Sequence, residues 1–244
     1  MTHSWVPSIY DSVWANVANK VHDGLDFSRW ANQDCYILAG GASVKLAGFD
    51  LNKLKDKNVI TVNRSVFDYG ESQINFAMDL SFLESIYAEV GSFKTVDAKN
   101  KWANYKGLKL FLCPSRVSDI RVEGKDLIYF IRRIVTQEIS RDIHLGISSV
   151  TNSGLAAILL ALALHAKRIF VLGMDMKLNG NSLYWHECHN VKSAQEYSTH
   201  FDSFISNTLM YAQLLKDEQV FLVGDPKYTA LNCFPIKSYV EVFG

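Results

Sequence analysis

The segment of the chain richest in reactive side chains runs from Gly173 to His189 and reads GMDMKLNGNSLYWHECH. Its two imidazoles, His186 and His189, titrate near neutral pH and are therefore suited to general acid–base catalysis. Together with Cys188 and His200 they are also a candidate zinc set, although this spacing matches no standard zinc motif. A third interpretation is that these are surface histidines without a catalytic role.

A glycine pair, Gly40–Gly41, follows the apolar run Cys35–Leu38, and Ser43 comes two residues later. Because glycine has no Cβ, backbone N–H groups at such a pair can approach an anion closely. The spacing matches neither GxGxxG nor GxxxxGK[ST]. The pair is thus either a phosphate cradle or a plain tight turn, and we expect it to serve as both.

Polar residues mark two more candidate positions. Asn63 and Arg64 directly follow a second apolar run, where an amide either caps the loop or recognises a base or sugar edge. The segment TNSG, residues 151–154, precedes an apolar helical pattern. Asn152 and Ser153 are preferred N-cap residues, and a capped helix N-terminus also receives phosphate, so both interpretations hold together.

Two single carboxylates, Asp79 and Asp175, each follow an apolar run. No DxD doublet of the kind that holds a metal-bound sugar nucleotide occurs, and no GxSxG elbow is present. The two carboxylates are nevertheless an alternative magnesium site if the fold brings them to one edge of a sheet.

Short apolar runs alternate with helical patterns along the chain. The runs predict buried strands at Cys35–Leu38, Val59–Val62, Ile74–Ala77, Leu108–Leu112, Ile169–Leu172 and Val220–Val223. The helical patterns cover about Leu80–Val90, Asp126–Ile139, Ser153–Ala166 and Ala194–Lys216. This alternation predicts an α/β, Rossmann-like, doubly wound and mostly parallel sheet with helices on both faces. Ligands of such sheets bind beyond the carboxyl ends of the strands, where the candidate residues stand.

The chain is predicted to hold one main domain, residues 31–244, because its 244 residues suffice for a single large core. Residues 1–30 carry apolar side chains at three-to-four spacing and predict an amphipathic helix. We expect this helix to pack on the main domain, and a homo-oligomer interface is the alternative.

Composition limits the partners and the compartment. With 25 basic and 25 acidic residues, no overall field attracts nucleic acid or an anionic membrane. The four cysteines are widely spaced without a CxxC pair, which favours a reducing, cytoplasmic setting. The longest apolar run, Leu155–Leu164, is too short to span a bilayer, and no signal-peptide pattern opens the sequence.

Taken in order, the segments AGGASV, ITVNRS, NSGLAAILLALAL, RIFVLGMDMKLNG and YWHECH resemble one superfamily. It includes single-domain bacterial sialyltransferases, the motility accessory factors that transfer nonulosonates to flagellin, and the archaeal 6-hydroxymethyl-dihydropterin pyrophosphokinase. The chain resembles most closely the phage and bacterial members of this superfamily whose function is unassigned.

The resemblance to the sialyltransferases implies transfer of a sugar from a CMP-nonulosonate without a metal cofactor. It implies that the nucleotide is lined by Gly41, Ser43, Asn63, Ser153 and Gly154, with Tyr184 near the phosphate. His189, or else His186, is implied as the base that deprotonates the acceptor. From their positions beyond the strands, Gly40, Arg64, Asn152, Asp175 and Lys177 complete the predicted nucleotide site.

Three departures from the superfamily pattern keep other functions open. Gly40 and Lys177 replace an asparagine and a tyrosine, and Asp79 stands where the sialyltransferases carry asparagine and the pyrophosphokinase carries aspartate. The first alternative is therefore a magnesium-dependent pyrophosphokinase in which Asp79 and Asp175 hold the ion. A second alternative is a non-catalytic module that binds a nucleotide. The sequence leaves the acceptor unidentified.

Overall fold

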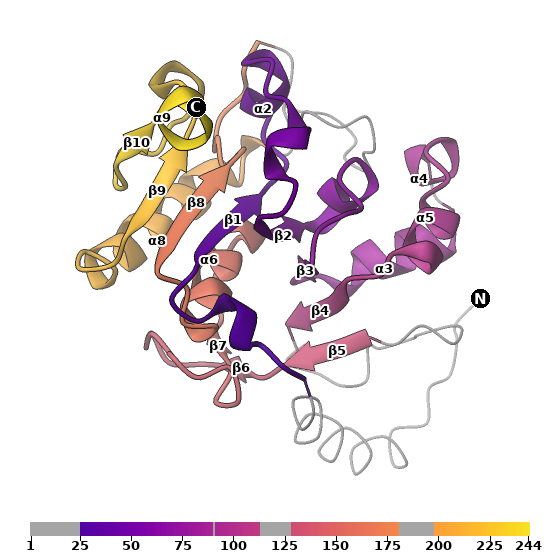
Figure 1. The fold of residues 1–244 in the computed structure, drawn as a ribbon, viewed down its shortest axis with the longest axis horizontal. Helices are drawn as coiled ribbons and strands as arrows, with labels where there is room; N and C mark the ends of the chain where they lie inside the picture. The colour runs from indigo at the N-terminus through magenta and orange to yellow at the C-terminus, as the bar shows by residue number, and fades with distance from the viewer. Residues whose placement is uncertain (1–24, 90, 113–127, 181–197) are drawn as a thin grey trace.

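The computed structural model describes residues 25–89, 91–112, 128–180 and 198–244 of the chain. At its centre eight strands form one sheet in the order β10-β9-β8-β1-β2-β3-β4-β5, with every neighbouring pair parallel (Figure 1). The strands are β1 (Asp34–Leu38), β2 (Asn58–Val62), β3 (Ile74–Ala77), β4 (Leu108–Leu112), β5 (Ile128–Ile131), β8 (Arg168–Leu172), β9 (Val220–Val223) and β10 (Ile236–Lys237). The predicted α/β, Rossmann-like fold is confirmed.

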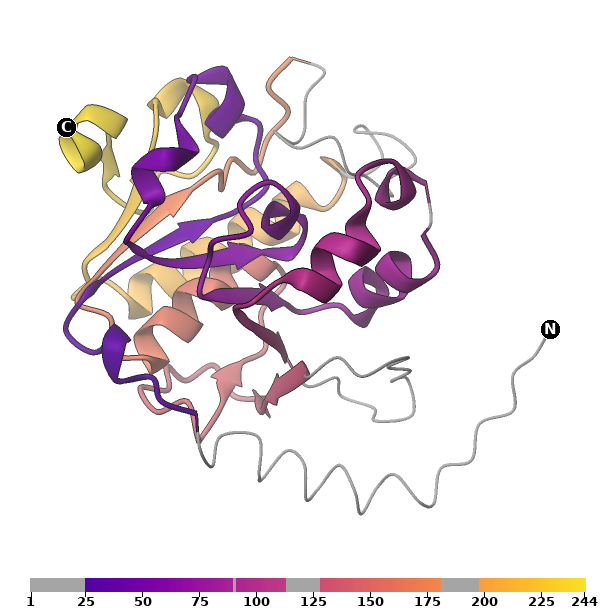
Figure 2. The ribbon, with the colours of Figure 1, turned by 45° about the vertical axis from the view of Figure 1, so that its right-hand side comes forward.

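Helices cover both faces of this sheet (Figure 2). The helices of one face are α6 (Ser153–Ala163) and α8 (Phe201–Leu214). Those of the other face are α2 (Ser43–Leu46), α3 (Leu80–Tyr87), α4 (Ser92–Thr95), α5 (Ala98–Asn104) and α9 (Tyr239–Phe243). Short 3₁₀ turns complete the chain: η2 (Ser28–Trp30), η3 (Leu51–Leu54), η4 (Asn63–Phe67) and η6 (Pro226–Tyr228).

The apolar runs form strands because both of their faces are buried. In β1, Ile37 packs with the α6 side of the core and Leu38 with the α2–α9 side, and neither side chain is exposed. Helix α6 is apolar all round for the same reason, since every residue from Gly154 to Ala163 is buried. All six predicted strands are present within one residue of their expected bounds.

The helix predicted at Asp126–Ile139 is wrong over the residues that the structure describes. Ile128–Ile131 forms β5 and pairs with β4, and β6 (Arg133–Ile134) pairs with β7 (Ile147–Ser148) in a separate small sheet. A run of four aromatic and β-branched residues fits a buried helix or a strand equally well by pattern. Its parallel pairing with β4, which a local pattern does not reveal, makes this segment a strand.

The predicted N-terminal helix lies outside the described residues up to residue 24. Where the description begins, Ser28–Trp30 forms a 3₁₀ turn whose Trp30 is buried in the main core. No helix in the described ranges is both long and apolar enough to cross a bilayer.

The chain reverses its direction of winding between β1 and β8. From β1 it adds strands on one side as far as β5, and it then returns to place β8 on the other side of β1. The helices described after β1 and β8, α2 and α8, lie on opposite faces of the sheet, and a crevice forms between them at the carboxyl edge. This topological switch point is where open α/β sheets bind their ligands.

We predict that Ile37→Ala lowers the free energy of unfolding by about 2–4 kcal/mol, because it opens a cavity in the central strand. Val240→Ala on α9, where the side chain is 75 % exposed, should change it by less than about 0.5 kcal/mol. Urea denaturation of both variants checks this. An equal effect of the two substitutions would contradict the packing of β1.

Candidate functional site

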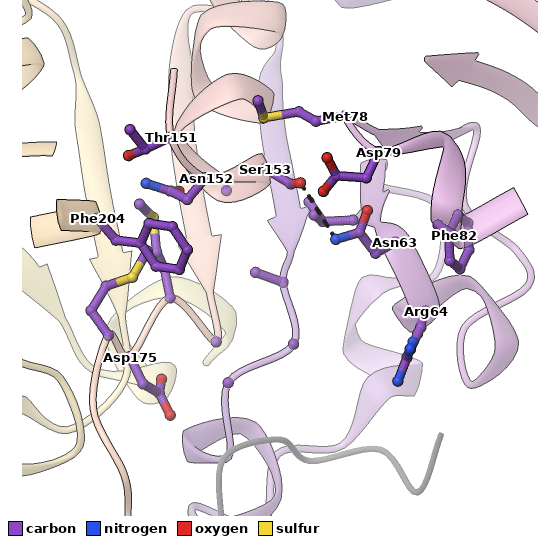
Figure 3. Close-up of a pocket in the computed structure, with 18 of the residues that line it drawn as sticks. Asn63, Arg64, Met78, Asp79, Phe82, Thr151, Asn152, Ser153, Asp175 and Phe204 are labelled. Atoms are coloured by element: carbon purple, nitrogen blue, oxygen red, sulfur yellow. Dashed lines mark hydrogen bonds between the residues drawn. The ribbon is translucent and has the colours of Figure 1, made fainter. Parts of the chain in front are cut away.

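A cavity of about 460 Å³ opens at the switch point, within the usual size of small-molecule sites (Figure 3). It is lined by Ala39, Gly40, Gly41, Val62, Asn63, Arg64, Met78, Asp79, Ser81, Phe82, Ser85, Thr151, Asn152, Ser153, Gly154, Gly173, Met174, Asp175, Met176, Lys177, Phe201 and Phe204. The walls thus come from the ends of β1, β2, β3 and β8 and from α3, α6 and α8. Nine of the predicted nucleotide-binding residues border this cavity, and Ser43 does not.

The glycine pair at the end of β1 packs against the loop after β8. The Gly41 N–H donates to the Gly173 carbonyl at 2.7 Å. A Cβ on Gly41 would lie 2.5 Å from the Asp175 Cγ and 2.6 Å from the Gly173 oxygen, so no larger residue fits. Gly41 therefore permits a close approach of two loops, and its amide is already used within the protein.

A buried carboxylate joins the same two loops. Asp175, only 4 % exposed, accepts the Ser43 hydroxyl at 2.5 Å and the Ser43 N–H at 2.8 Å, and Asn179 Nδ2 donates to it at 3.0 Å. Burial raises the pKa of this carboxyl, and the bonds from Ser43 and Asn179 oppose the rise. Both carboxylate oxygens are thus engaged, which does not fit the alternative role of Asp175 as a magnesium ligand beside Asp79.

The first turn of α6 is held in place by its cap and by α8. The Asn152 side chain accepts the Leu155 N–H at 2.8 Å as N-cap. Asn207 of α8 accepts both the backbone N–H and the hydroxyl of Thr151, at 3.0 and 3.1 Å. An N-terminus of this kind presents unpaired amides and a positive dipole end, and here it faces the cavity at Ser153–Gly154.

Asn63 adopts a left-handed conformation, with φ of 52°, directly after β2. Its carbonyl accepts the amide of Asn75, a fully buried residue of β3, at 2.9 Å. Its own amide reaches the Ser153 hydroxyl at 3.4 Å, while the Asn63 Oδ1 has no hydrogen-bond partner. Strained residues that the surroundings hold in place concentrate at functional sites, and Met176 on the opposite wall, with φ of 51°, is another.

Asp79 is the N-cap residue of α3, but its carboxylate makes no capping hydrogen bond. An N-cap aspartate ordinarily accepts a backbone N–H of the first turn. Figure 3 shows the Asp79 carboxylate beside Asn63 and Ser153 at the cavity. Although Asp79 is exposed, the protein around it displaces water and raises the pKa of its carboxyl, and the positive charge of Arg133 opposes this rise.

Lys177 and Arg64, which line the cavity, both contact other parts of the protein. Lys177 Nζ donates to the Lys227 carbonyl. The Arg64 guanidinium lies over the Phe93 ring, 4.5 Å from its centre. Of the predicted phosphate ligands, Lys177 is thus turned away from the cavity in this structure.

Several predicted residues lie outside the described part of the chain. These are Tyr184 and both histidines of the predicted base, His186 and His189, together with Cys188 of the zinc alternative. His200 is described, and its ring stacks on the Phe204 ring with 5.9 Å between the ring centres. Across residues 25–89, 91–112, 128–180 and 198–244, no cluster of three metal-ligating side chains occurs.

The sequence did not single out one wall of the cavity. Phe201 and Phe204 of α8, with Met174 and Met176 after β8, make it apolar and aromatic. A helix that packs on a core carries such residues anyway, so nothing in the pattern of α8 distinguishes them. A flat apolar wall opposite polar groups suits a ligand with a ring.

Comparison with protein-family models, with curated proteins and with solved structures found no match to this chain.

We predict that Gly41→Ala lowers the free energy of unfolding by about 1–3 kcal/mol, because the added methyl overlaps Asp175 and Gly173. The matched control is Gly70→Ala, where the nearest atom to a new Cβ is the Val66 oxygen at 3.7 Å. Chemical denaturation of the two variants checks the difference. Wild-type stability of Gly41→Ala would rule out the close contact of the two loops.

We predict that Asp79→Asn raises the melting temperature at neutral pH by about 1–3 °C, a small gain because the carboxylate is exposed and screened. The folded protein raises the pKa of Asp79, so its ionisation disfavours folding. The gain should shrink as the pH falls through the raised pKa of the folded state and vanish below the unperturbed value of 3.8, where the carboxyl is neutral in both states. Melting curves across pH, with Glu84→Gln on the same helix as control, check this. A gain that does not depend on pH would contradict it.

Proposed function

We propose that the protein is a nucleotide-dependent transferase that moves a sugar from a nucleotide-activated donor, of the CMP-nonulosonate type, to an acceptor hydroxyl. The observation that carries the proposal is the cavity at the β1–β8 switch point, into which the first turn of α6 opens. This is the place where parallel α/β sheets bind nucleotides, with a helix N-terminus available to a phosphate. The order of motifs resembling the sialyltransferase superfamily supports the same assignment.

In this proposal the donor phosphate lies at the Ser153–Gly154 amides, and Asn63 is held by Asn75 to face the same place. The aromatic wall of Phe201 and Phe204 accommodates a ring of the donor. The acceptor oxygen attacks the sugar carbon as the bond to the phosphate oxygen breaks, and that electron pair leaves with the nucleotide. Positive dipole at the helix end stabilises the charge that develops on the phosphate.

His189 or His186 takes the proton of the acceptor hydroxyl in this scheme, as the superfamily resemblance implies. Both belong to the part of the chain that the structure does not describe. Their assignment is tested by function alone: His186→Ala and His189→Ala should leave nucleotide binding intact, and loss of the base should abolish transfer. Full transfer by both variants would contradict a histidine base, whereas nucleotide binding without any transfer by the wild type would favour the non-catalytic binding module. We further propose a cytoplasmic location, which suits the free thiols of Cys35 and Cys233.

Asp79 favours a second candidate, the magnesium-dependent pyrophosphokinase, because its uncapped carboxylate borders the cavity. The partner assigned to it, Asp175, is committed to Ser43 and does not fit that role. This candidate would require both ATP and a divalent ion for binding.

A thermal-shift panel separates the two candidates. CMP, CDP, UDP, GDP and ATP are each tested with magnesium and with EDTA. A ligand at 100 times its dissociation constant adds about 2.7 kcal/mol of stability, which corresponds to a rise of about 5–10 °C for a chain of this size. We expect a cytidine nucleotide to give this shift in EDTA. A shift confined to ATP with magnesium would favour the pyrophosphokinase, and no shift with any nucleotide would contradict both.

We predict that Asn63→Gly weakens binding of the active nucleotide about tenfold, the cost of one polar contact. Glycine keeps the left-handed backbone of this position and removes only the amide. Asn32→Gly is the matched control, since Asn32 has φ of 58° and stands before β1, at the opposite edge of the sheet. Titration calorimetry of both variants checks the prediction. Equal affinities would show that Asn63 does not contact the nucleotide.

A further inference from the structure

The cavity has one wall whose chemistry differs from that of a phosphate site. We call it the Asp79 wall, formed by Asp79 after β3 and by Ser81 and Ser85 of α3. Its ionisable group is an acid that makes no capping bond to α3. The Asp79 carboxylate therefore presents to the cavity acceptor oxygens that α3 does not use.

The charges elsewhere on the cavity do not neutralise this wall. Lys177 donates to the Lys227 carbonyl, and Asp175 is held by Ser43 and Asn179. The Arg64 guanidinium lies over the Phe93 ring, and Arg133 is the cation whose charge acts on Asp79 and lowers the pKa of its carboxyl. A second anion placed against Asp79 would meet repulsion, which at about 4 Å is worth several kcal/mol near a protein surface before the attraction of Arg133 is counted.

The cavity is wide enough for this wall to bind a separate group. β3 is two strands away from β1, and strands lie about 4.8 Å apart, so the two strand ends are separated by about 10 Å. The first turn of α6 lies between these two strand ends, since the Asn63 amide is 3.4 Å from the Ser153 hydroxyl. A donor phosphate at Ser153–Gly154 therefore has the β1–β8 loops on one side and the Asp79 wall on the other, where another part of the substrate can bind. Figure 3 shows this division, with Asp79 and Asn63 on one side and Asp175 and Phe204 on the other.

We propose that the Asp79 wall binds the acceptor through a hydrogen-bond-donating group, a hydroxyl or an ammonium, and excludes acceptors that carry a carboxylate or phosphate at that point. The group sits between Asp79 and the donor phosphate, donates to the carboxylate, and separates the two negative charges. This inference rests on the proposed glycosyl transfer and adds to it the class of acceptor. Asp79 is then the residue that determines acceptor charge.

Three sugars test the proposal: glucose, which is neutral, glucosamine, which carries an ammonium group at C2, and glucuronate, which carries a carboxylate at C6. Ligand-observed NMR titration measures the dissociation constant of each with the wild type. We expect glucuronate to bind at least about tenfold more weakly than glucose, and glucosamine to bind no more weakly than glucose. Equal or tighter binding of glucuronate, or no binding of any of the three, would overturn the proposal.

Two variants assign the effect to Asp79. Asp79→Asn should bring the dissociation constants of the three sugars within about threefold of one another, because the amide carries no charge. Glu84→Gln removes the same charge from an exposed position of α3 that does not line the cavity, and it should keep the wild-type order. An unchanged order in Asp79→Asn would overturn the proposal. The melting curve of each variant verifies that it is folded.

The nucleotide panel is measured on the same protein and separates the two failures. Nucleotide binding without discrimination between the sugars would contradict only the Asp79 wall. Discrimination between the sugars without any nucleotide shift would contradict the proposed donor and leave the charge selectivity in place.

Discussion

The site depends on a buried contact between the loops that leave β1 and β8. Asp175 binds both the hydroxyl and the backbone amide of Ser43, and the Gly41 N–H binds the Gly173 carbonyl beside them. A carboxylate is costly to bury, and these hydrogen bonds offset that cost only while the two loops stay together. These contacts close the bottom of the crevice at the switch point; we call them the floor of the cavity.

Around this floor, Asn63 and Thr151 are each held by a residue behind them. Asn75 fixes the left-handed turn of Asn63, and Asn207 anchors Thr151 at the start of α6. These supporting residues belong to neighbouring strands and helices, so the cavity is shaped before any ligand arrives. Asp79 differs from them, because its carboxylate borders the cavity and makes no capping hydrogen bond to its own helix, α3. That contrast is why we assign to Asp79 a contact with substrate.

Much of the fold could be predicted because continuous apolar runs of four or five residues demand burial on both faces, as in β1 and β8. Ile128–Ile131 was misassigned because its run is equally compatible with a helix, and only pairing with β4 distinguishes the two. Residues at strand ends could be predicted as neighbours from topology alone. The hydrogen bonding of Asp175 within the protein could not be predicted, since its partner Ser43 lies 132 positions away in the sequence.

The central claim is that a nucleotide binds at the β1–β8 switch point. Hydrogen–deuterium exchange with and without CMP tests it directly, because amides that contact or enclose a ligand exchange more slowly. Bound CMP should slow exchange in residues 39–43, 62–64, 151–155 and 173–177, which lie together at the carboxyl edge. Protection confined to other segments, or none at saturating CMP, would contradict it.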